Sequence, residues 1–147
     1  MVKLEFELIP DGCWKYNLRT ILSKAQWDFL KAEAKKKANG KCAICGKETA
    51  RLEAHERWSY NTNTSTQKLE DIVAVCKDCH AVIHINRTWI KGNIERAENH
   101  YMKINNCSYA EYRKNLGIAN EKHKKLNEVS SWKLDLTCLK KYVETEK

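Results

Sequence analysis

The chain has 147 residues, of which 42% are hydrophobic, and it carries a formal net charge of +8. A chain of this length supports one core of ordinary size but not two large ones. No run approaches the roughly 20 apolar residues that span a bilayer. Residues 1–14 also lack the apolar stretch of a signal peptide, so we expect a soluble, cytoplasmic protein with no membrane partner.

The positive charge lies in two segments that flank a nearly neutral centre. Residues 1–41 carry a net charge of +4 and residues 85–147 carry +5, whereas residues 42–84 carry −1. Basic flanks attract phosphates, although solvated helix faces give the same composition. We divide the chain into N-terminal strands and a helix (1–41), a core (42–92) and a basic helical C-terminal arm (93–147).

The first segment is expected to contain two strands and one helix. Polar and apolar residues alternate over 4–8 and again over 14–18, which predicts two half-buried strands joined by a turn at 10–12. Ser23 is followed three residues later by glutamine, a capping-box signal. The pattern behind it predicts a helix from about 24 to 38, ended by an Asn-Gly pair.

The centre of the chain predicts a strand, a loop, a strand and a helix. Residues 49–60 alternate as a strand does, and residues 71–76 form a second short apolar run. Between them, residues 61–67 contain no apolar side chain and are expected to form an exposed loop. From Asp78 onward the apolar spacing becomes helical.

The last segment is expected to be mostly helical. Helical patterns cover 93–104 and about 108–128, and the second begins with another capping box. Residues 130–136 alternate again and predict a final strand, which we expect to pair with the strand at 14–18. The chain as a whole is therefore predicted to be α+β.

The cysteines give the strongest chemical signal. Four of the seven form two C-x2-C pairs: Cys42, Cys45, Cys76 and Cys79. Two such turns place four thiolates at the corners of one tetrahedron, which suits a structural zinc ion. Iron–sulfur clusters use spacings that bunch three cysteines together, and the three isolated cysteines receive no function.

The segments CAIC (42–45), LEAHERW (52–58) and VCKDCHAVIH (75–84) resemble the HNH endonucleases of the ββα-metal class. The likeness is to the version whose core is stapled by a four-cysteine zinc. It implies an α+β fold with a zinc-stapled ββα-metal core and flanking helices, and an enzyme that hydrolyses DNA phosphodiester bonds with a metal ion. A basic helical tail after such a core fits a nuclease of phage or mobile-element type.

The resemblance also implies roles for five residues. His80 falls on the family's metal-ligand position, and His84 lies one helical turn further on the same face. If His55 is a third ligand, Glu56 becomes the base; otherwise His55 is itself the base. Neighbours in a strand point to opposite faces, and Glu56 shares its face with apolar residues, which favours His55. Asp71 occupies the place of the family's asparagine and would orient an imidazole.

These roles call for a second divalent ion besides the structural zinc. Magnesium prefers oxygen ligands, so an imidazole-rich site favours Mn²⁺, Ni²⁺, Co²⁺ or Zn²⁺ over Mg²⁺. The basic arms are expected to dock DNA. Two other functions fit the same sequence: a catalytically inactive, zinc-stabilised DNA-binding module, and a protein-binding adaptor. Nothing in the sequence indicates the oligomeric state.

Overall fold

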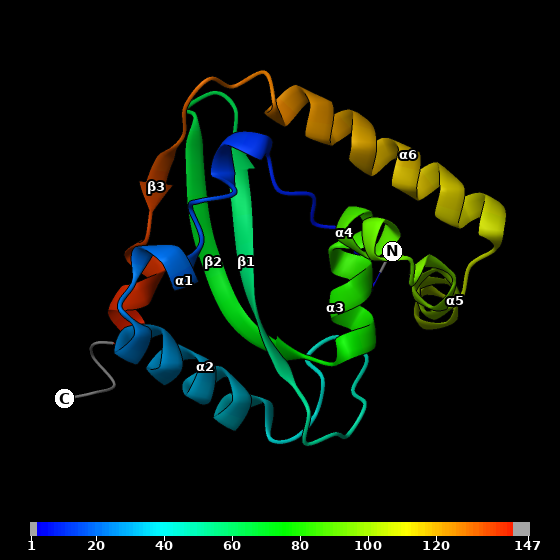
Figure 1. Ribbon diagram of the computed structural model, residues 1–147, viewed down its shortest axis with the longest axis horizontal. Coiled ribbons are helices and arrows are strands. Elements are labelled where there is room, and N and C mark those ends of the chain that lie inside the picture. The colour runs from blue at the N-terminus through cyan, green and yellow to red at the C-terminus, as the bar shows by residue number, and fades with distance from the viewer. Residues whose placement is uncertain (1–2, 143–147) are drawn as a thin grey trace.

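The computed structural model, which describes residues 3–142, is built around a long β-hairpin with helices on both sides (Figure 1). Strand β1 (Glu53–Asn61) pairs antiparallel with β2 (Thr66–Val75), and β3 (Lys133–Asp135) adds parallel to β2. The sheet order is β1-β2-β3. The mixed α+β class is therefore confirmed.

The hairpin is longer than the sequence predicted. Residues 61–67 were expected to form an exposed loop, but β1 and β2 extend into that range and leave only 62–65 between them. The Gln67 side chain is buried and donates a hydrogen bond to the Tyr16 carbonyl at 3.0 Å. The expected loop was wrong at its C-terminal end because Gln67 pairs with Tyr60 in the hairpin and its side chain packs inside the protein.

Within residues 3–142, five helices have seven residues or more. They are α2 (Lys24–Ala38), α3 (Lys77–Ile83), α4 (Ile85–Lys91), α5 (Ile94–Asn105) and α6 (Tyr109–Leu126). Ser23 and Ser108 form the predicted capping boxes of α2 and α6. Three shorter pieces complete the described chain: η1 (Asp11–Cys13), α1 (Leu18–Ile21) and η2 (Thr137–Leu139).

The two N-terminal strands predicted from the sequence are not formed. Residues 4–8 adopt neither helix nor strand, and η1 and α1 border the range 14–18. The Asn105 side chain instead bonds the Leu4 amide and carbonyl at 2.8 and 2.9 Å, and the Glu7 amide donates to the Ile83 carbonyl at 2.9 Å. The alternating pattern reflects packing on helices α3 and α5, not pairing in a sheet.

The predicted C-terminal strand exists but has a different partner. Leu134 of β3 is aligned with Gln67 of β2, so the predicted pairing with 14–18 was wrong. Just before β3, Trp132 is buried and packs edge-on against Tyr60, with ring centroids 5.4 Å apart. The strand therefore covers the first three residues of β2, 66–68, at the edge that faces away from β1.

Two of the three hydrophobic clusters within residues 3–142 lie on the two sides of the hairpin (Figure 1), and the third, smaller cluster contains Leu126 and Trp132. Helix α2 covers one side, with Trp27 and Leu30 packed in the same core as Ile72 of β2. The larger core on the other side joins the N-terminal segment, the ββα unit and the C-terminal helices; it includes Leu4 and Tyr101. Within residues 3–142, no helix is both long and apolar enough to cross a bilayer.

The N-terminal segment is expected to stabilise the fold although it belongs to no strand. The Leu4 side chain is 0% exposed, so Leu4→Ala leaves a cavity in the larger core. Such substitutions lower the free energy of unfolding by about 2–5 kcal/mol. Urea denaturation measures the loss, and Ile118→Ala on the exposed face of α6 is the control, with a change near zero. Equal effects for the two variants would show that residues 3–8 do not pack as described.

Candidate metal centres

The four paired cysteines come together as one group of sulfur atoms. Their Sγ atoms all lie within 4.8 Å of one another, and the Cys45 and Cys76 sulfurs are 3.7 Å apart. In a tetrahedron with metal–sulfur bonds of about 2.3 Å, neighbouring sulfurs are roughly 3.8 Å apart. The group can therefore hold a metal ion, as predicted from the spacing.

Two local structures place these sulfurs. After α2, the loop turns through Asn39 and Gly40, both at positive φ, and the Gly46 amide closes a turn on the Cys42 carbonyl at 3.0 Å. On the other side, Cys76 is the N-cap of α3. The Ala43 amide also donates to the Ala74 carbonyl at 2.9 Å, so a backbone hydrogen bond holds the first C-x2-C turn against the end of β2, next to the second pair.

Backbone N–H groups point at the sulfurs. The Ile44 amide donates to Cys42 Sγ and the Cys79 amide donates to Cys76 Sγ, both at 3.4 Å. A hydrogen bond from Cys79 lowers the pKa of Cys42, and the same shared proton raises the pKa of Cys79. Donors aimed at sulfur stabilise thiolates, which are the form that binds metal.

The three predicted histidines form a second, separate group. His55 comes from β1, and His80 and His84 come from α3 and its C-terminal end; one nitrogen of each lies within 4.8 Å of the others. The ring centroids are 4.9–5.5 Å apart. The structure thus brings together all three imidazoles that the sequence singled out.

Two carboxylates orient two of these rings. His80 Nδ1 donates to Glu53 Oε1 at 2.8 Å, and His55 Nε2 donates to Glu7 Oε2 at 3.0 Å. A carboxylate that holds one ring nitrogen fixes the tautomer and leaves the other nitrogen with its lone pair. For His80 the nitrogen left free is Nε2.

His84 lies at the joint between α3 and α4. Its backbone, with φ −100° and ψ 53°, ends one helix and begins the next. The Thr88 hydroxyl donates to the Ala81 carbonyl at 2.6 Å and so satisfies an acceptor near this break. The joint is therefore fixed by a side-chain hydrogen bond one turn away from His84.

The environment favours neutral imidazoles, the form that binds metals. Burial lowers the pKa of His80. Burial, with the nearby charges of His80, His55 and Arg87, lowers the pKa of His84 to about 3. At neutral pH, His80 and His84 therefore offer unprotonated ring nitrogens.

Two residues predicted for the site lie elsewhere. Glu56 Oε1 accepts a hydrogen bond from the Leu18 amide at 2.7 Å, and burial raises the pKa of this carboxyl group. Asp71 accepts hydrogen bonds from Lys141 Nζ at 3.1 Å and from the Ile72 amide at 2.8 Å. Glu56 points to the opposite face of β1 from His55, and neither carboxylate joins the imidazole group.

Sequence reasoning missed three residues that contact the two groups. Glu53 precedes His55 by two residues in a strand, so alternation could have placed both on one face. His100, on α5, has its Nε2 atom 3.2 Å from Cys79 Sγ. Glu7 and His100 are distant in the sequence from their partners, so no local spacing indicates these contacts.

Comparison with family models, with curated proteins and with solved structures finds no match to this chain.

Changing one clustered cysteine is expected to remove bound metal and stability together. Cys76→Ser leaves three sulfurs, and the binding free energy of a structural metal is part of the folding free energy. We expect metal analysis to show the loss of one ion per chain and thermal melting to shift to lower temperature. Cys107→Ser, outside the group, is the control and should keep both values. An unchanged melting curve for Cys76→Ser would contradict a structural metal.

Proposed function

We propose that this protein is a DNA endonuclease of the HNH type that requires a divalent metal ion. The four cysteines would hold a structural zinc ion, and the histidine group would hold a second divalent ion. The observation that carries the proposal is the convergence of imidazoles from β1 and α3 beside a separate four-sulfur group, which joins the loop before β1 to the start of α3.

The two donor sets suit two different ions. Four thiolates form a closed tetrahedral shell, so His80 is not needed to complete it although it follows Cys79 directly. Imidazoles with free nitrogens bind Mn²⁺, Ni²⁺, Co²⁺ or Zn²⁺ well. A shell made of few protein ligands keeps positions open for water and substrate, as a catalytic site requires.

His80 and His84 are the proposed ligands of the second ion. Glu53 holds Nδ1 of His80, which leaves Nε2 with its lone pair to bind an ion. When bound there, a divalent ion would neutralise charge on the scissile phosphate and on the departing 3′ oxygen. Glu53 is not counted as a ligand because its carboxylate holds His80. The preference for Mn²⁺, Ni²⁺, Co²⁺ or Zn²⁺ over Mg²⁺ therefore follows from the imidazoles alone.

His55 is the proposed general base. The alternative base, Glu56, is turned to the opposite face of β1 and is held by the Leu18 amide. Glu7 accepts the Nε2 proton of His55, which leaves the Nδ1 lone pair to take a proton from water. The Glu7 carboxylate would also stabilise the imidazolium formed in that step, as the carboxylate of a catalytic triad does.

Cleavage of supercoiled plasmid in a panel of divalent ions tests the activity. His80→Ala removes a proposed ligand, so it should abolish nicking while the cysteine-bound metal and the melting temperature remain. His123→Gln, on α6, is the matched control and should nick as the original chain does. Retained nicking by His80→Ala, or loss of the cysteine-bound metal, would contradict the assignment. DNA binding without any nicking would instead favour an inactive binding module.

The rate of cleavage and the binding of the second ion together distinguish a general base at position 55 from a metal ligand. A general base contributes about 10²–10⁴-fold to the rate, so His55→Ala should lower kcat by this amount. Binding of the second ion, measured by titration with Mn²⁺, should change little, in contrast to His84→Ala. Glu56→Gln, the neighbour on the opposite face, should keep the rate. If His55→Ala loses the second ion, His55 is a ligand and not the base.

A further inference from the structure

Helix α4 follows the two histidines after a break in the helix at His84. The His84 amide donates to the His80 carbonyl (3.2 Å) and the Thr88 amide donates to the His84 carbonyl (3.1 Å), so α4 begins directly at the end of α3. Within α4, Ile90 and Lys91 follow Arg87 by three and four residues, so these three side chains lie on one side of the helix.

Both cations on this side are exposed, and neither forms an ion pair within residues 3–142. Arg87 lies in the first turn of α4, three residues after His84. A cation without an acidic partner beside a metal centre is suited to hold an anion.

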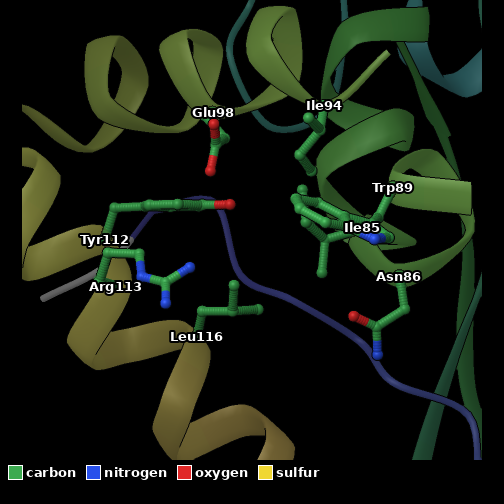
Figure 2. Close-up of a pocket in the computed structure, with 8 residues that line it drawn as sticks. All are labelled: Ile85, Asn86, Trp89, Ile94, Glu98, Tyr112, Arg113 and Leu116. Atoms are coloured by element: carbon green, nitrogen blue, oxygen red, sulfur yellow. The ribbon is translucent and has the colours of Figure 1, made fainter. Parts of the chain in front are cut away.

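An exposed apolar side chain lies between these two cations. Ile90 is 83% exposed, the highest value among the large apolar side chains of the described chain. Its neighbour Trp89 is accounted for differently: it lines a cavity of about 230 Å³ between α4, α5 and α6, facing Tyr112 and Leu116 (Figure 2). Ile90 does not line this cavity. Its side chain points into solvent, and nothing in residues 3–142 covers that side chain.

We propose that Arg87, Ile90 and Lys91 form a duplex-binding ridge, in which the two cations contact backbone phosphates and Ile90 inserts between neighbouring base pairs. The inference rests on the proposed function, because it takes DNA as the ligand of the histidine site. It goes further by naming how the duplex is held and by stating that the duplex is bent next to the histidines.

The chemistry of the ridge favours DNA over a protein surface. Side chains such as Ile act as wedges that unstack a base step, and the cost is recovered because the bent duplex contacts more protein. Phosphates on both sides of such a step lie within reach of flanking cations. A protein partner would need an acidic surface around an apolar pocket, whereas a duplex supplies phosphates along its whole length.

A 20-base-pair duplex with a dye at each end reports both the affinity for DNA and the bending of the duplex. These two measurements test the cations and the Ile90 wedge separately. Arg87→Ala and Lys91→Ala should each weaken binding roughly fivefold at 0.15 M salt and lower the slope of log affinity against log salt by about 0.9. Ile90→Ala should keep that slope and abolish the shortening of the dye-to-dye distance. Ile90→Lys should steepen the slope and still fail to bend the duplex.

Ile118→Ala and Lys122→Ala on α6 are the matched controls, and both should bend and bind as the original chain does. Thermal melting confirms that the exposed substitutions leave the fold intact. Bending by Ile90→Ala or Ile90→Lys equal to that of Ile118→Ala would overturn the wedge, and absence of duplex binding by the original chain would overturn the ridge.

The same samples tested for plasmid nicking keep the two proposals apart. If the original chain nicks DNA and its Ile90 variants still bend the duplex, the proposed nuclease function stands and the proposed ridge is wrong. If the original chain bends DNA through Ile90 but does not nick it with any divalent ion, the proposed ridge stands and the proposed nuclease function is wrong.

Discussion

The four-sulfur group is the constraint on which the rest of the described fold depends. It joins the loop after α2, the end of β2 and the first turn of α3, and His100 adds a contact from α5. Because Cys76 and Cys79 begin α3, holding their sulfurs fixes where this helix starts and how it leaves the sheet. His80 and His84 are then carried to the face where β1 presents His55, so one constraint positions the other group.

Two donor chemistries keep these neighbouring groups distinct. Soft thiolates with backbone donors aimed at them suit a closed shell, whereas imidazoles oriented by Glu7 and Glu53 keep free nitrogens. Cys79 and His80 are adjacent in sequence yet belong to different groups, because successive residues of a helix point about 100° apart. In the proposed nuclease, this separation leaves the working ion free to exchange ligands without loosening the fold.

The sequence predicted well the features that depend on local chemistry. The capping boxes at Ser23 and Ser108 and the cysteine pairs are determined by residues a few positions apart. The failures share one cause, which is long-range packing. Residues 4–8 alternate as a strand would, but the Asn105 side chain satisfies the Leu4 backbone, and no local signal could identify a partner about a hundred residues away.

The same argument explains the residues around His55. Alternation within β1 correctly separated His55 from Glu56, since this depends on a single strand. The carboxylate that serves His55 comes instead from Glu7, whose amide is anchored on the Ile83 carbonyl of α3. That bond ties the first segment of the chain to the helix that bears His80 and His84. The N-terminal segment thus supports the histidine group from outside the ββα unit, and any shift of α3 would move both His55's partner and the two helical imidazoles together.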